Sequence, residues 1–406
     1  MTEASTSRHE EDAAKGSAGE VFAAFFKLGL TSFGGPIAHL GYFRDELVLR
    51  RKWIGDQGYA DLVALCQFLP GPASSQVGFA LGLLRGGPLG AAAAWAAFTL
   101  PSAILLMLFA LGAAALDGPI GSGIVHGLKV VAVAIVAQAV WGMARNLCPD
   151  RERASIALGA VLIVILMAGS LGQITAIVVG AIAGLLLCRN QGAAITHHIS
   201  FPVSRTSGAI FLVLFFILLF GLPILAINSQ GLAVFDSFYR AGSLVFGGGH
   251  VVLPLLESEV VRSGWVSRDQ FLAGYGAAQA VPGPLFTFAA YLGTVLGTEP
   301  NGLLGAGIAL VAIFLPGFLL LLGVIPFWDS FRQRGGAQGL MRGTNAAVVG
   351  ILGAALYDPV FTSAVVGPYD FALALTCFVL LMVWRLPPWV VVVVAAFGGV
   401  LIGLAA

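Results

Sequence analysis

The sequence Gln67-Phe-Leu-Pro-Gly-Pro72 lies in the middle of an apolar stretch and recurs as Gln279-Ala-Val-Pro-Gly-Pro284. Proline removes a backbone donor and clashes with the preceding helical turn, and glycine adds conformational freedom, so a helix should break at both places. Because proline is favoured at the first helical position, a new half-helix is expected to begin at Pro72 and at Pro284. The same break at two places indicates a repeated unit.

A second pair of segments supports the duplication. Lys27-Leu-Gly-Leu-Thr-Ser-Phe-Gly-Gly35 aligns without a gap with Arg240-Ala-Gly-Ser-Leu-Val-Phe-Gly-Gly248, and in the same register Glu46 falls on Glu259. These blocks precede the Pro-Gly-Pro motif in both halves, and chance hardly produces such an ordered series. We therefore interpret the chain as two diverged copies of one unit.

The boundaries of the copies follow from the repeat and from local composition. Residues 1–20 are polar and acidic, which predicts a disordered cytoplasmic tail without a cleavable signal. The two repeats are expected at residues 21–195 and 208–406, with a polar linker at residues 196–207.

Composition indicates that lipid is the main solvent of this chain. Hydrophobic residues make up 58% and charged residues only 10% of the sequence, whereas a soluble protein carries roughly 25% charge. Several uncharged stretches exceed the roughly 20 residues that a helix needs to cross the hydrocarbon. They lack the alternation of an outer-membrane barrel, so the predicted fold is an all-α polytopic membrane protein. A net charge of +1 argues against a nucleic-acid partner.

The placement of arginine and lysine predicts the topology. Basic clusters at residues 44–52, 145–153, 189–205 and 332–342 alternate with acidic or uncharged connections, and basic loops face the cytoplasm. The basic and the acidic connections fall on opposite sides of the membrane if each motif-bearing segment enters the membrane and returns to the same side. Five full crossings then separate equivalent points of the two halves, and this odd number inverts the second copy. The expected location is a bacterial inner membrane, with the N-terminus in the cytoplasm. The five crossings are expected near residues 89–115, 125–146, 154–170, 172–189 and 208–228.

The two breaks predict an anion site at the interface of the copies. A helix that begins inside the membrane presents unpaired amides and the positive end of its dipole, which attract an anion without a formal charge. Hydroxyl and amide side chains nearby add donors. The alternative is a packing kink without a ligand. The predicted substrate-binding residues at the breaks are Gln67, Pro70, Gly71, Pro72, Ser74, Ser75, Gln279, Pro282, Gly283, Pro284 and Thr287.

The Phe-Gly-Gly segments supply a second set of candidates. Gly34, Gly35, Gly247 and Gly248 permit close backbone approach, or a nest of amides around an anion. Tight packing of helices through small residues is the competing interpretation.

Lys27 and Arg240 occupy the same position in the two repeats, just before the glycines. An ionisable side chain at membrane depth costs about 2.5–3.5 kcal/mol and usually marks a substrate path. The alternatives are snorkelling of Lys27 to the headgroups and a local ion pair of Arg240 with Asp236.

Five further residues are candidates for coupling or gating. The equivalent acids Glu46 and Glu259 could exchange protons if they are partly desolvated. His39 and His250 lie near the glycine breaks and could line a gate or carry protons. Arg44 belongs to the first basic cluster, whose simplest role is to set the topology.

Other chemistries find no support in the sequence. The four cysteines are scattered and form no Cys-x-x-Cys pair, so we expect neither a metal site nor a cofactor. A nucleotide-binding loop and a clustered catalytic set are both missing, which argues against ATP hydrolysis and against an enzyme.

The motifs together resemble the chromate ion transporter (CHR) family in its long, two-domain form. The resemblance rests on residues 27–39, on residues 44–53 and on the doubled Gln-x-x-Pro-Gly-Pro, and it covers the chain from about residue 20 to the C-terminus. It implies an efflux carrier that confers chromate resistance, with sulfate as the competing ion. Two departures, Pro36 against Gly249 and Arg44 against Glu257, indicate that the halves have specialised.

We therefore expect a secondary transporter that exports chromate by alternating access, driven by the membrane potential and with protons as a candidate coupling ion. The alternatives are a carrier of sulfate or another oxyanion, inward or outward, a passive anion channel, and a membrane-embedded enzyme that acts on lipid-linked substrates. The lipid bilayer is the expected surrounding. The sequence is compatible with a homodimer but does not fix the oligomeric state.

Overall fold

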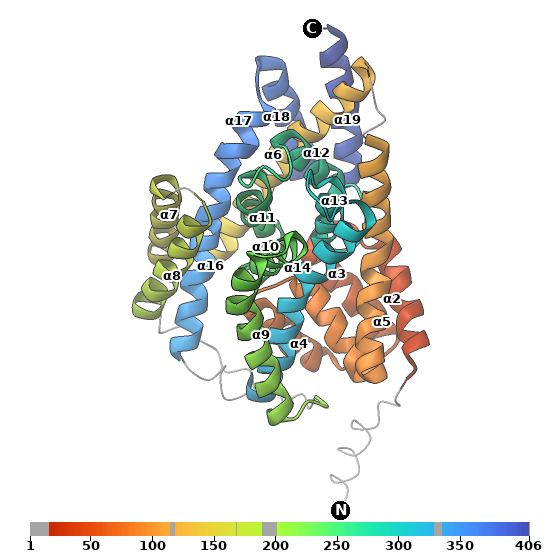
Figure 1. Ribbon diagram of the computed structural model, residues 1–406, viewed down its shortest axis with the longest axis vertical. Coiled ribbons are helices and arrows are strands. Elements are labelled where there is room, and N and C mark those ends of the chain that lie inside the picture. The colour runs from red at the N-terminus through yellow and green to blue at the C-terminus, as the bar shows by residue number, and fades with distance from the viewer. Residues whose placement is uncertain (1–15, 114–117, 168, 189–200, 329–334, 406) are drawn as a thin grey trace, which may run out of the picture.

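The computed structural model describes residues 16–113, 118–167, 169–188, 201–328 and 335–405 (Figure 1). Most of the predicted tail and the first five residues of the predicted linker lie outside these ranges, as do parts of two basic clusters. All regular structure in the described ranges is helical, and six helices there are long and apolar enough to cross a membrane. The prediction of an all-α polytopic membrane protein is therefore confirmed. These six spans are Ala73–Gly112, Pro119–Leu147, Ser170–Leu187, Arg205–Ala226, Gly302–Phe327 and Gly336–Ala364.

The N-terminal half is a series of short helices around the motifs followed by long ones. Its elements are α2 (Ala18–Thr31), α3 (Gly35–Phe43), the π-helical turn η1 (Arg44–Arg50), α4 (Asp56–Phe68), α5 (Ala73–Ala113), α6 (Pro119–Leu147), α7 (Arg151–Leu166) and α8 (Ser170–Leu187).

The C-terminal half repeats this order after the connecting helix α9 (Arg205–Ala226). Its motif region comprises α10 (Gln230–Ser243), η2 (Gly249–Val251), α11 (Val252–Leu256), η3 (Glu257–Val261), α12 (Arg268–Ala278), η4 (Leu285–Thr287) and α13 (Phe288–Val295). The rest comprises α14 (Gly302–Val324), η5 (Ile325–Phe327), α16 (Gly335–Ala355), η6 (Leu356–Phe361), α17 (Thr362–Ala364), α18 (Pro368–Met382) and α19 (Pro388–Ala405). The π-helical turns η1 and η3 fall at equivalent positions, which supports the repeat.

Helix α5 is in fact a hairpin of two helices. Its backbone leaves the helical conformation at Gly86 and Gly87. A Cβ added to Gly82 would lie 2.8 Å from the Cβ of Ala94, although twelve positions along a straight helix span about 18 Å. In the second half, α13 and α14 make the same close approach through two glycines, so this hairpin is also repeated.

The Pro-Gly-Pro motifs break their helices as predicted. Helix α4 ends at Phe68 and α12 at Ala278, and the next helices begin at Ala73 and Leu285. Each restart therefore comes one residue later than expected, and in the second half its first turn is a 3₁₀ helix. The glycine of each motif has a positive φ, which an L side chain rarely adopts.

The two halves exchange their terminal hairpins. Helix α6 packs along α19 and also contacts α18, whereas α16 packs against α7 and α8. Figure 1 shows both contacts, with α6 beside the last two helices and α16 crossing the α7–α8 pair. Close approach of glycines makes the packing tight: an added Cβ would collide with backbone at Gly127 and at Gly184. The halves thus form one interlocked body.

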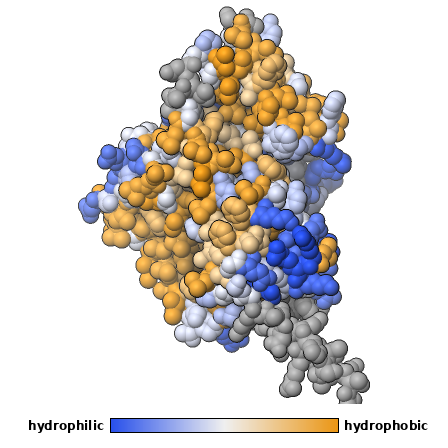
Figure 2. Space-filling view, turned by 90° about the vertical axis from the view of Figure 1, so that its right-hand side faces the viewer, coloured by the Kyte–Doolittle hydropathy of each residue, from blue (hydrophilic) through white to orange (hydrophobic). Residues whose placement is uncertain are grey.

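Five helices separate equivalent points of the two halves in the described part of the chain: the second segment of α5, then α6, α7, α8 and α9. This odd number matches an inverted second copy. Within the most apolar stretch of α9 only 11% of residues are buried, as expected for a helix that faces lipid. Figure 2 shows apolar residues over most of one face, with hydrophilic residues in a large group at the lower right and in smaller groups at the upper right and the left edge.

Candidate functional site

The repeated motifs meet at two equivalent backbone hydrogen bonds. The amide of Gly71 donates to the carbonyl of Val245 over 2.7 Å, and the amide of Gly283 donates to the carbonyl of Ser32 over 2.8 Å. Ser32 and Val245 directly precede the two Phe-Gly-Gly segments. Each Pro-Gly-Pro turn is therefore bonded to the Phe-Gly-Gly segment of the other half, and these two amides are not available to a ligand.

A second pair of contacts ties each turn to a long helix. The side-chain amide of Gln76 donates to the carbonyl of Pro70 over 3.0 Å and to that of Gly317 in α14 over 2.9 Å. In the other half, the hydroxyl of Ser102 in α5 donates to the carbonyl of Pro282. The four motifs thus form one crossing with approximate two-fold symmetry.

A cavity of about 550 Å³ lies beside this crossing and is lined by both halves. Its described walls contain no lysine, arginine, aspartate or glutamate. Their polar side chains are uncharged amides together with one histidine, whose Nδ1 lies 2.8 Å from the Tyr275 hydroxyl. Such walls offer hydrogen-bond donors and present no carboxylate to repel an anion. The polar residues are Gln67, Gln138, Asn146, His250, Gln279 and Asn345.

The structure places about a third of the predicted site residues on this cavity. Both Phe-Gly-Gly segments contribute their glycines, and both Pro-Gly-Pro motifs contribute their leading glutamine. Ala73, the first residue of α5, also lines the cavity, so the N-terminal end of that half-helix reaches the wall. The predicted residues on the cavity are Gly34, Gly35, Gln67, Gly71, Gly247, Gly248, His250 and Gln279.

Three polar lining residues did not figure among the candidates from the sequence. Gln138 and Asn146 lie on α6, and Asn345 lies on α16. Gln138, Gly142 and Asn146 recur every four residues and therefore share one face of α6. Polar residues at this spacing in an apolar helix are the signal that could have identified that face.

The other residues of the Pro-Gly-Pro motifs lie behind the cavity wall, and their predicted role in binding remains a prediction. The hydroxyl of Ser74 is 3.4 Å from Nδ1 of His39, and the Thr287 hydroxyl donates to the carbonyl of Pro284 over 2.8 Å. The Ser75 hydroxyl is buried, with no hydrogen-bond partner among the described residues. Residues of the breaks that do not line the cavity are Pro70, Pro72, Ser74, Ser75, Pro282, Gly283, Pro284 and Thr287.

Lys27 and Arg240 form equivalent ion pairs away from the cavity wall. The Lys27 ammonium lies 3.1 Å from Glu46, and the Arg240 guanidinium lies 2.8 Å from Glu259. Arg240 is also 3.1 Å from Asp236, the local pair that the sequence offered as an alternative. Substrate contact by either cation would therefore require its ion pair to open.

Glu46 is the centre of a larger charge cluster outside the candidate membrane spans. Arg50 and Arg51 lie 3.0 and 2.9 Å from its carboxylate, which is 9% exposed. Burial alone would raise the pKa of Glu46, but hydrogen bonds from Arg51, Lys27 and Arg50 lower it to about 2. Glu46 is therefore ionised at neutral pH in this conformation, and proton exchange there would require the cluster to separate. Arg44 pairs instead with Asp56 at 2.8 Å, and both side chains are exposed.

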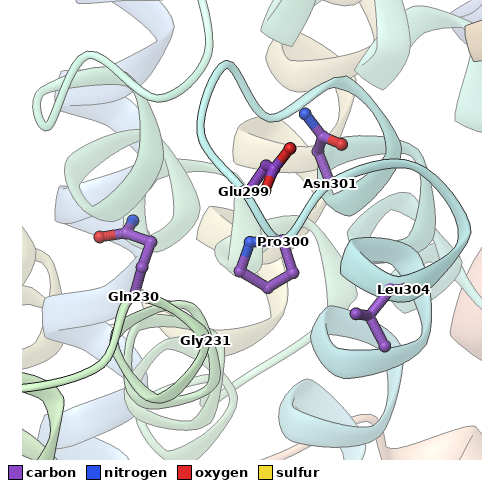
Figure 3. A pocket seen from close by; sticks show the side chains of 6 residues that line it. All are labelled: Gln230, Gly231, Glu299, Pro300, Asn301 and Leu304. Carbon is purple, nitrogen blue, oxygen red and sulfur yellow. The ribbon is translucent and has the colours of Figure 1, made fainter.

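A second, shallow hollow of about 410 Å³ lies between the start of α10 and the segment before α14 (Figure 3). It is lined by Gln230, Gly231, Glu299, Pro300, Asn301 and Leu304. Among the described residues that line it, Glu299 is the one charged group, so this hollow suits an oxyanion less well than the cavity at the crossing.

A helical membrane protein made of two interlocked repeats, with a cavity that holds uncharged polar side chains where their helix breaks cross, has the architecture of a transporter. The comparison with known proteins agrees. The chain belongs to the chromate transporter family, whose description is "Chromate transporter" and whose model matches residues 19–185 and 232–400. The two matched segments correspond to the two repeats, so the resemblance seen in the motifs is confirmed.

Individual relatives cover almost the whole chain. It is 29% identical to a chromate transport protein of Pseudomonas aeruginosa, over 93% of this chain and 90% of that protein. It is 27% identical to a chromate transport protein of Cupriavidus metallidurans, over 94% and 91% of the two chains. An uncharacterized transporter of Methanocaldococcus jannaschii is 28% identical over 83% of each chain. No solved structure matches the chain.

Proposed function

We propose that this protein is a secondary transporter that exports chromate from the cytoplasm across the bacterial inner membrane and thereby confers chromate resistance. The observation that carries the proposal is the cavity at the crossing, whose walls come from both halves and hold uncharged hydrogen-bond donors. The names of the two bacterial relatives support chromate as the cargo. The proposed activity is transport alone, without a catalytic step.

The chemistry of the cavity suits a tetrahedral oxyanion. Chromate carries two negative charges and four acceptor oxygens, and it must exchange its water shell for protein donors. The amides of Gln67, Gln279 and Asn345 can each donate, and α5 begins at the wall with Ala73. The low dielectric of the membrane interior strengthens each of these bonds.

The symmetry of the crossing supports alternating access. Both turns make the same hydrogen bond to the opposite half, and both halves hold an equivalent ion pair, Lys27–Glu46 and Arg240–Glu259. Inverted repeats can exchange their conformations, so that the cavity opens to one side and then to the other. In this proposal the ion pairs are the gates, and their carboxylates are the places where protons could couple to transport.

Energetics favours export. A cell interior that is negative by about 100 mV drives out a dianion with roughly 4–5 kcal/mol, at about 2.3 kcal/mol for each elementary charge. Loading from the cytoplasm is consistent with a cytoplasmic N-terminus and a cytoplasmic first basic cluster, which the distribution of arginine and lysine predicts.

The direct test is flux through purified protein in liposomes. Vesicles loaded with chromate should release it faster when their interior is made negative, with a pH gradient imposed separately to reveal any role of protons. Asn345→Leu and Gln279→Leu should reduce the flux, whereas Gln230→Leu, which alters a glutamine outside the cavity, should not.

Other outcomes would redirect the proposal. Counterflow of labelled sulfate that exceeds that of chromate would identify a sulfate carrier, and single-channel currents would identify a channel. A wild-type protein without chromate flux in either direction would refute the proposed function.

A further inference from the structure

The walls of the cavity hold neutral donors, although the proposed cargo is a dianion. Their described residues include no lysine or arginine. The two motif cations, Lys27 and Arg240, are occupied by Glu46 and Glu259. A dianion that moves from water to this cavity would lose hydration without meeting a formal positive charge, which is costly. A cation near the mouth would offset part of that cost.

Two arginines lie directly beside lining residues. Arg145 precedes the lining residue Asn146 on α6, and in helical projection it falls at the edge of the lining face, next to Gln138. Arg385 precedes the lining residue Leu386 in the turn between α18 and α19. Both arginines are exposed, and neither has an ion-pair partner among the residues that the structure describes.

The turn that carries Arg385 is held against the cavity. Arg385 has a φ of 55°, a left-handed conformation that is unusual for a residue other than glycine. The amide of Leu386 donates to the carbonyl of Leu380 over 3.0 Å, which closes the turn. The ring of Trp389 lies 6.5 Å from that of Phe33, the residue before the first lining glycine. A strained residue that its surroundings hold in place is common at functional sites.

We propose that Arg385 and Arg145 form an electropositive mouth through which the oxyanion enters the cavity. The inference rests on the proposed function and adds the route of loading. The guanidinium groups attract a tetrahedral dianion from water and hold it while the amides of the wall replace its hydration shell. Arg145 belongs to a basic segment with a predicted cytoplasmic location, so the mouth opens to the side from which export begins. Such attraction raises the encounter rate and is screened by salt.

The test compares charge with backbone shape at one position. Arg385→Asn removes the charge, while asparagine tolerates the left-handed conformation, so the turn should persist. Arg385→Lys restores the charge. Arg145→Gln tests the second arginine, and Arg205→Gln, at the exposed start of α9 and away from the cavity wall, is the matched control.

Initial rates of chromate flux from proteoliposomes, measured at low and high salt, decide the matter. At low salt we expect a loss of about fivefold for Arg385→Asn and about tenfold for the double variant with Arg145→Gln, and both should converge with wild type at high salt. Arg385→Lys should recover most of the rate. The proposal of an electropositive mouth would be wrong if Arg385→Asn kept the wild-type rate at low salt. It would also be wrong if the loss in Arg385→Asn persisted at high salt and Arg385→Lys did not restore the rate.

Equilibrium binding of chromate to the purified protein gives the same comparison without transport. If wild type showed no flux, the proposed function would fail, but the salt dependence of binding in these variants would still decide whether the arginines attract the anion.

Discussion

Replacing Gly283 by alanine should weaken the crossing of the two halves. Gly283 has a φ of 93°, and its amide donates to Ser32 of the other half. A Cβ at this position would overlap the Ser102 hydroxyl and lie 3.1 Å from the carbonyl oxygen of Phe98. Both neighbours belong to α5, so the Ser102 hydroxyl, which donates to Pro282, must rotate away and the backbone at Phe98 must give slightly.

The expected loss of stability has two parts. A left-handed backbone costs an L residue about 1–2 kcal/mol, and forcing an extra carbon into a packed site costs about 1–3 kcal/mol. Together they amount to about 2–5 kcal/mol, a large share of the roughly 5–15 kcal/mol that stabilises a folded domain. Flux of chromate should fall as well, because the displaced turn adjoins the cavity.

Two matched glycines separate strain from overlap. Gly87 has a φ of 65° and a ψ of −159°, a conformation almost confined to glycine, and the space around its Cβ position is open, so Gly87→Ala should cost only the strain, about 1–3 kcal/mol. Gly112 is helical and equally open, so Gly112→Ala should be neutral or gain about 0.5–1 kcal/mol. The assay is the midpoint of thermal unfolding in detergent, with chromate flux alongside. A Gly283→Ala protein as stable as Gly112→Ala would refute the reasoning.

Three further predictions test the charge clusters and the helix breaks. Glu46→Gln should destabilise the protein by about 1–3 kcal/mol at neutral pH, because it removes the common partner of three cations. Since the pKa of Glu46 is depressed in the folded state, the contribution of Glu46 to stability is present above pH 4.5 and is lost as the pH falls toward about 2. If the unfolding midpoints of wild type and variant stayed equally far apart at low pH, this prediction would be wrong. Arg240→Gln should raise the Kd for chromate more than Lys27→Gln, because Arg240 is the less exposed cation, and equal effects on Kd would show that this ranking is wrong. The double variant Pro70→Ala and Pro284→Ala should abolish export while the protein remains in the membrane, and normal efflux by it would rule out a site that depends on the broken helices.

The breaks of the helices were predictable because their causes are local. Proline and glycine act on the turn in which they stand, so residues 67–72 and their repeat predict a break of the helix without any knowledge of the fold. The position of the restart was off by one residue, since Pro72 and Pro284 cap the new helices rather than begin them. Caps depend on hydrogen bonds that a pattern of residue types does not reveal.

The pairing across the crossing was not predictable in the same way. The bond from Gly71 to Val245 joins residues that are far apart in the chain, and it depends on how the two halves dock. The ion pairs did leave a trace. Lys27 and Glu46 have the same separation in sequence as Arg240 and Glu259, 19 residues in each case. A repeated spacing between opposite charges is a signal that the acid and the base are partners.

The cavity shows the same limit. The spacing of Gln138, Gly142 and Asn146 marks one face of α6, but nothing in the sequence relates that face to Asn345. These residues line one cavity because α6 and α16, which come from different halves, both reach the crossing. Gln67 and Gln279, which the repeat places at equivalent positions, do line the cavity. What remained hidden is the convergence of unrelated positions, which requires the tertiary arrangement.

The exchange of hairpins between the halves bears on how this protein is made. When the first half leaves the ribosome, α16 has not yet been synthesised, so no long helix of the second half covers the glycines of α8 and the alanines of α7 that pack against it in the folded protein. Likewise, α6 can make its contacts with α18 and α19 only after these two helices have been synthesised. Each half therefore lacks part of its helix packing until the other half has entered the membrane. The contacts between the halves must form at the end of assembly and not at its start.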